Sequence, residues 1–89
     1  MTTDAASWDP AAEAERLFDR DVTTQWDAAM MPSRAWAALR DAVTAAATGQ
    51  LDDTGIAAAA RQATGDDSAA RALAAQCRAV VRAARPRGD

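Results

Sequence analysis

The sequence predicts an all-α protein, a small antiparallel helical bundle of three to four helices. In four segments, apolar side chains recur at spacings of three and four residues, which places them on one face of a helix. Glycine, proline and short polar residues stand between these segments, as they do at helix ends. No segment alternates apolar and polar residues in the manner of a half-buried strand. The expected helices cover about 9–30, 33–48, 54–64 and 68–85.

Length and composition limit the size of the core. With 89 residues the chain forms one domain, expected over 9–85 between flexible ends at 1–8 and 86–89. Hydrophobic residues make up 49% of it, but 27 of them are alanine, which adds little burial energy. A core this small leaves the free energy of folding close to zero. We therefore expect a partner, either another protein or a second copy of the chain.

The first helix is expected to begin at Asp9, as its N-cap, with Pro10 at the first helical position. One helix to about Met30 is favoured, although three β-branched residues at 22–24 form a weak point where it could kink. Its apolar face comprises Ala11, Ala14, Phe18, Val22, Trp26, Ala29 and Met30.

The second helix should begin just after Pro32, since the residue before a proline is driven out of the helical conformation and Ser33 can cap the new helix. Gly49 is expected to end it. Its apolar face comprises Trp36, Leu39, Val43, Ala46 and Ala47.

Aspartates are the expected caps of the last two helices, with Gly65 between them and Pro86 at the end. The third helix turns Ile56, Ala59, Ala60 and Ala63 inward. The inward face of the fourth comprises Leu73, Cys77, Val80 and Ala84, with Val81 at its edge.

Several kinds of chemistry are excluded by composition. The chain has no histidine and one cysteine, Cys77, so zinc fingers and Ser/His/Asp triads cannot form. Asp52 and Asp53 lack the alternate spacing and distal glutamate of a calcium loop, and are expected to be helix caps. Cys77 lies on an apolar helix face, where it serves as a small buried hydrophobe. We therefore expect no enzymatic activity, no metal site and no cofactor.

Large side chains gather where the first two helices meet. The simplest interpretation is a core in which tryptophans face each other and methionines fill gaps. Leu17 and Met31 fall off the main apolar face, however, and leftover tryptophan and methionine serve interfaces as anchors. The candidate partner-binding residues are Trp8, Leu17, Trp26, Met30, Met31 and Trp36.

Charge is unevenly distributed along a chain of net charge −3. The first 30 residues are acidic and the last 29 basic, so the two ends should attract one another, within a chain or between chains. Arginines fall on one side of the fourth helix, where they form a solvated face or contact an acidic partner or phosphates. This set comprises Arg71, Arg78, Arg82 and Arg85.

Nucleic acid is disfavoured as the partner by the net charge. A helix-turn-helix motif would need a small residue four positions before the turn glycine Gly65, and Arg61 stands there. The alternative of a nucleic-acid-associated regulator that uses the arginine helix nevertheless stays open.

The preferred function is a non-catalytic protein–protein interaction module, a small accessory subunit or regulator of a bacterial complex. A second alternative is a non-catalytic subunit of an enzyme, with a ligand site lined by tryptophan and methionine. The absence of lysine, with arginine in its place, fits a GC-rich bacterial genome. One cysteine, no signal peptide and no membrane-spanning run favour the cytoplasm.

Overall fold

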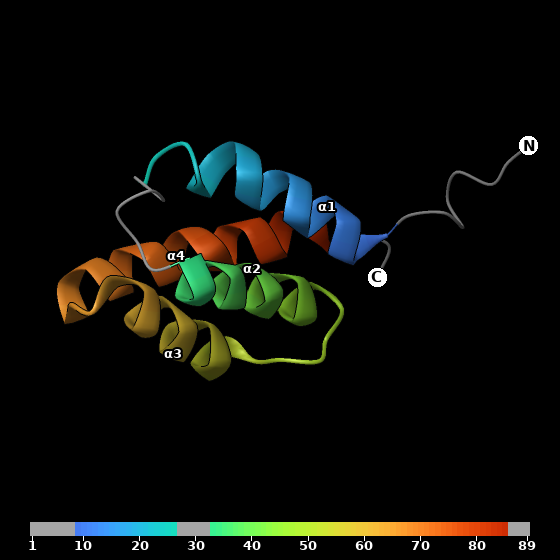
Figure 1. The fold of residues 1–89 in the computed structure, drawn as a ribbon. Coiled ribbons are helices and arrows are strands. Elements are labelled where there is room, and N and C mark those ends of the chain that lie inside the picture. Colours follow the sequence, from blue (N-terminus) through green and yellow to red (C-terminus); the bar gives the residue numbers. More distant parts are fainter. Residues whose placement is uncertain (1–8, 27–32, 86–89) are drawn as a thin grey trace, which may run out of the picture.

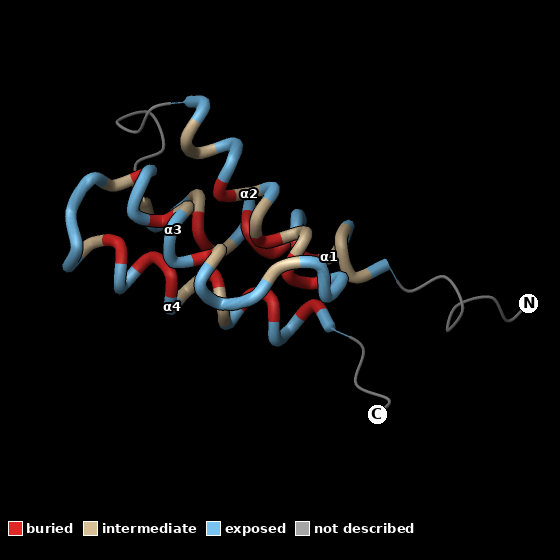
Figure 2. Tube along the Cα trace, turned by 90° about the horizontal axis from the view of Figure 1, so that it is seen from below, coloured by how far each residue is buried: buried red, intermediate tan, exposed pale blue. Residues whose placement is uncertain are grey.

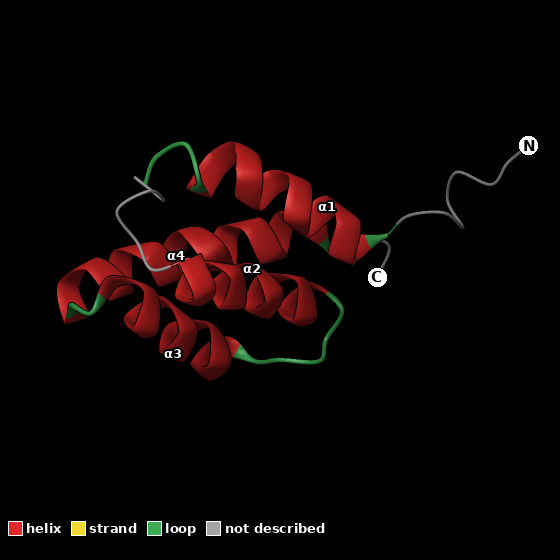
Figure 3. Ribbon diagram, viewed as in Figure 1, coloured by secondary structure: helices red, strands yellow, loops and turns green. Residues whose placement is uncertain are grey.

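The structure is a computed structural model that describes residues 9–26 and 33–85. These residues form an all-α bundle without strands (Figure 3). Its elements are α1 (Pro10–Leu17), the π-helical segment η1 (Phe18–Val22), α2 (Ser33–Ala47), α3 (Asp53–Thr64) and α4 (Asp67–Ala84). The predicted fold class is confirmed.

The helix α4 is the element that the others pack around. It contacts α3, α2, α1 and η1, and α2 also contacts α1 and α3. Figure 1 shows α1 on one side of the α2–α4 pair and α3 on the other. Figure 2 shows that buried positions lie on the inward side of each helix, with exposed positions outside.

Helix ends have the predicted chemistry. The Asp9 carboxylate accepts from the amides of Ala11 and Ala12 at 3.1 and 3.3 Å, and the Asp66 carboxylate accepts from Ala69 N at 2.8 Å. Each bond satisfies an amide that the first turn of a helix leaves without a partner. Gly65 ends α3 with φ +70°, a left-handed conformation that glycine adopts without steric cost.

The first helix departs from the prediction of a single helix to Met30. Its regular part ends at Val22, and turns occupy residues 23–26; positions 27–30 lie outside the described residues. The end falls at the β-branched run. Before it the winding loosens into η1, where Thr23 N donates to Phe18 O across five residues at 3.0 Å.

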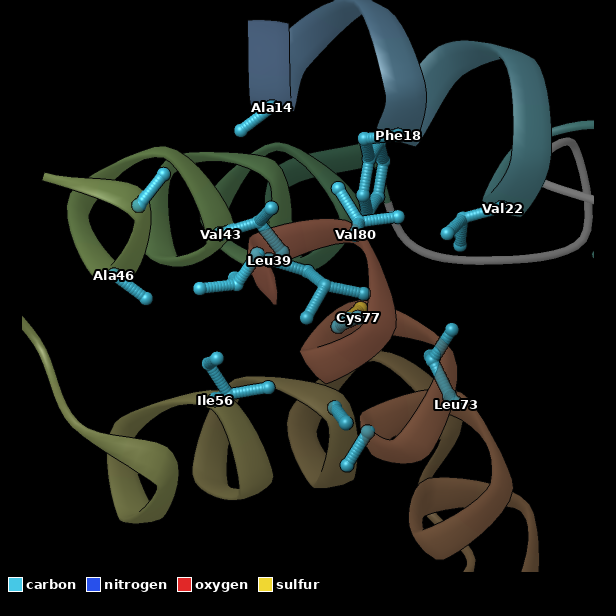
Figure 4. Packing of buried hydrophobic residues seen from close by; sticks show 14 of the residues in the cluster. Ala14, Phe18, Val22, Leu39, Val43, Ala46, Ile56, Leu73, Cys77 and Val80 are labelled. Atoms are coloured by element: carbon cyan, nitrogen blue, oxygen red, sulfur yellow. The ribbon is translucent and has the colours of Figure 1, made fainter. Parts of the chain in front are cut away.

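The core collects the predicted inward faces of all four helices (Figure 4). Phe18, Leu39 and Leu73 are fully buried, and Cys77 lies among them. Val22, Val43, Ile56 and Val80 are buried as well, and the buried alanines of α3 and α4 allow these two helices to pack closely. Leu17, expected off the main face, is 6% exposed and belongs to this core.

Candidate functional site

A groove of about 970 Å³ lies between α4 and the connection from α2 to α3. We call it the arginine groove. Two segments distant in sequence form it: one runs from the end of α2 through the next loop to the start of α3, and the other is the last two turns of α4. Its lining comprises Ala46, Gly49, Gln50, Leu51, Asp52, Asp53, Thr54, Arg78, Val81, Arg82 and Arg85.

The α4 wall of the groove is a consequence of helix geometry. Leu73, Cys77 and Val80 point into the core, which fixes the rotation of α4. Positions 78, 82 and 85 then share one side of the helix, because steps of four and seven residues return to nearly the same direction. Val81 lies at the edge of the core and is 8% exposed. The wall therefore presents three arginine side chains beside Val81.

Two of these arginines have no partner within the described part of the chain. The side chains of Arg78 and Arg82 make no ion pair or hydrogen bond there, and the Arg78 Nη1 atom is buried without an acceptor. Arg85 Nη2 donates to Ala46 O at 3.0 Å. Ala46 O also accepts from Gly49 N at 3.1 Å, so the arginine adds a second bond at the C-terminal end of α2, where a cation is favoured by the helix dipole.

The opposite wall is built from the loop and the first turn of α3. Asp52 caps α3: its carboxylate accepts from the Thr54 hydroxyl and from Gly55 N, and these bonds lower the pKa of Asp52. The Asp53 side chain is exposed and makes no ion pair within the described residues. Leu51 lies so close to Gly55 that a Cβ there would stand 2.5 Å from its Cγ. Glycine at 55 thus lets Leu51 fold against α3.

The acidic first helix does not pair with α4 among the described residues. Arg40 of α2 lies 2.8 Å from Asp19 and 3.7 Å from Glu15, which ties α1 and η1 to α2 instead. The remaining ion pairs of this region are local, Arg16 with Glu13 and Arg20 with Asp21. Among the residues that the structure describes, the expected attraction between the two halves of the chain is therefore not seen, and the groove arginines make no ion pair with these acids.

The tryptophans are half-buried against the core. The Trp36 ring lies 5.3 Å from the Phe18 ring at an interplanar angle of 52°. Trp26 Nε1 donates to the Gln76 side-chain oxygen, which joins the turn after η1 to α4. The structure thus brings Trp26 and Trp36 to the same core, with Leu17 buried beneath the surface. Trp8, Met30 and Met31 lie outside the described residues.

The predicted arginine set is divided by the structure. Arg78, Arg82 and Arg85 line the groove, whereas Arg71 is exposed on α4 and does not. Sequence reasoning missed the opposite wall, residues 49–54, which it treated only as a loop and cap. No local pattern marks this segment as a wall, because it becomes one only through the packing of α2, α3 and α4.

Reactive groups are scarce in this structure. Cys77 is buried, and desolvation raises its pKa to about 12, so its thiol stays protonated. Residues 9–26 and 33–85 contain no group of three acidic or cysteine side chains placed to hold a metal, and no helix there is long and apolar enough to cross a membrane.

Comparison with protein-family models, curated proteins and solved structures gives no match to this chain.

Proposed function

We propose that this chain is a non-catalytic protein–protein interaction module, a small accessory subunit or regulator of a bacterial complex, and that it contacts its partner at the arginine groove. The observation that carries the proposal is the pair Arg78 and Arg82, which stand without acid partners, among the described residues, on the wall of an open groove. Arginine is enriched at protein interfaces, because its planar donors and long apolar stem suit a partly buried contact.

The tryptophan corner, formed by Trp26 and Trp36, supports the proposal less well. Both rings pack against the core, and the Trp26 indole N–H is already satisfied by Gln76. These contacts fit a structural role in closing the bundle. An enzyme subunit with a ligand site at this corner therefore ranks below an interaction module.

A nucleic-acid-associated regulator is the second candidate. It is favoured by Arg71, Arg78 and Arg82, which succeed one another along a single helix. The acids Asp52 and Asp53 on the facing wall oppose it, because their carboxylates repel phosphates at the same groove.

Affinity capture from the native cell tests the proposal. Wild-type protein and Arg71→Gln, a control that removes one arginine of the same helix outside the groove, should retain the same protein in stoichiometric amount. The double variant Arg78→Gln/Arg82→Gln should lose it, and nuclease treatment should leave the result unchanged. Equal retention by all three proteins, or a complex that nuclease dissolves, would contradict the proposal.

A further inference from the structure

We propose that the arginine groove binds an acidic segment of the partner protein, whose glutamate or aspartate side chains pair with Arg82, Arg78 and Arg85. This inference rests on the proposed function and adds the chemistry of the partner. A guanidinium group presents N–H donors in a fork that matches the two oxygens of a carboxylate. The groove holds three such groups on one wall.

Over residues 9–26 and 33–85, the arginines of this wall are unpaired, because the acids of α1 and η1 pair with other arginines. Glu13, Glu15, Asp19 and Asp21 pair with arginines of α1, η1 and α2. On α4, Arg78 and Arg82 use none of their side-chain donors within the described residues, and Arg85 uses one nitrogen on Ala46 O; of the Arg78 nitrogens, Nη1 is buried, so a ligand meets the others. A ligand that brings carboxylates therefore meets donors with no competing acceptor in the described part of the chain.

The spacing of the arginines indicates how such a segment would lie. At a rise of about 1.5 Å per residue, Arg82 stands about 6 Å and Arg85 about 10.5 Å along α4 from Arg78. An extended peptide places alternate side chains about 6.8 Å apart on one face. Acidic residues at alternate positions would therefore reach successive guanidinium groups. Val81 and Leu51 line the same groove and offer apolar surface to the rest of the segment.

Asp53 on the facing wall makes it possible to distinguish an acidic ligand from a basic one. Asp53 is exposed in the groove and lacks an ion-pair partner within the described part of the chain, so it repels an acidic ligand and attracts a basic one. Neutralising Asp53 should tighten the binding of an acidic segment. The same change would weaken the binding of a basic segment, so the two ligand classes give opposite results.

A peptide titration tests these expectations. The probe is a fluorescein-labelled peptide of alternating glutamate and alanine, and its control replaces every glutamate with glutamine. Fluorescence anisotropy is measured with the full chain at low salt. Binding should need the glutamates and weaken with added salt. Arg78→Gln/Arg82→Gln should reduce the affinity about tenfold or more, as expected for the loss of charge-assisted hydrogen bonds.

Two further variants test where the peptide binds and whether the groove prefers an acidic ligand. Arg71→Gln removes one positive charge from α4 outside the groove and should change the affinity less than about twofold, since an exposed charge two turns away is screened. Asp53→Asn should raise the affinity. Circular dichroism of each variant shows whether helix content is kept.

Each contrary result has a distinct meaning. Equal binding of the glutamine peptide, an equal loss in Arg71→Gln, or weaker binding in Asp53→Asn would overturn the acidic-segment proposal. So would tighter, salt-sensitive binding of duplex DNA than of the glutamate peptide. If the peptide fails to bind while capture from the cell still depends on Arg78 and Arg82, the inference fails and the proposed function stands. If groove-dependent capture is also absent, the proposed function fails.

Discussion

Cys77 shows how strongly one buried position can be shaped by its surroundings. Its side chain is fully enclosed by the core, and desolvation raises the pKa of the thiol to about 12 from its usual value of 9.0; the nearby charge of Arg78 opposes this shift only in part. The chain contains no lysine, tyrosine or histidine. Cys77 is therefore the side chain that titrates between the range of the carboxylates and that of the arginines.

We therefore predict that the protein loses stability at alkaline pH and that the Cys77 thiol alone causes this loss. Between pH 9 and 12 the unfolded thiol ionises while the folded thiol stays protonated, so the unfolded state binds fewer protons and stability falls as pH rises. The free energy of unfolding should drop by about 1.4 kcal/mol per pH unit in this range. Urea unfolding at about pH 8 and about pH 10.5, monitored by tryptophan fluorescence, should show a drop of about 2 kcal/mol.

The matched control is Cys77→Ala, which keeps a small apolar side chain at the site. Its free energy of unfolding should be nearly the same at both pH values. A drop in Cys77→Ala as large as in the wild type would show that the thiol is not the group responsible.

At the scale of elements, the first helix shows a feature that periodicity alone does not reveal. Ala14, Phe18, Val22 and Trp26 recur every four residues, and in an α-helix each such step turns the side chain by about 40°. The i to i+5 bond from Thr23 N to Phe18 O loosens the winding and offsets this drift. Phe18 and Val22 are both fully buried as a result.

The cap of α4 gives a prediction at this scale. Asp66→Ala removes the carboxylate that accepts from Ala69 N, and should lower the free energy of unfolding by about 1 kcal/mol. Asp66→Asn should cost much less, because an asparagine oxygen caps about as well as aspartate. Thermal unfolding monitored by circular dichroism measures both. Equal losses in the two variants would indicate that the charge, rather than the cap, is responsible for the stabilisation.

How much of the fold can be predicted from the sequence depends on how local its signals are. The starts and ends of α2, α3 and α4 lie within one residue of the prediction, since caps such as Asp66 and stops such as Gly65 act over one turn. The first helix ends earlier than predicted, at the β-branched run 22–24, where the sequence indicated only a weak point. Its π-helical last turn could not be predicted, because such a segment and the i+4 pattern of an α-helix look alike in sequence.

At the scale of the whole molecule, the arginine groove is the feature that could not be predicted from the sequence. Its walls, residues 46–54 and 78–85, are far apart along the chain and meet only when α2 and α4 pack together. The arginine stripe was predictable from helical spacing, but its division into three groove residues and one outside, Arg71, was not. The bonding of the acids to Arg40 rather than to α4 likewise depends on how the helices pack.

The arginine groove and the tryptophan corner are thus the two candidate partner-binding surfaces. An NMR titration of the ¹⁵N-labelled chain with the alternating glutamate peptide distinguishes them most directly. Binding at the groove predicts that the largest amide shift changes fall in residues 49–54 and 78–85, and that Arg78→Gln/Arg82→Gln abolishes them. Changes centred on Trp26 and Trp36, or small changes spread evenly over the described helices, would contradict the claim that this groove is where the partner binds.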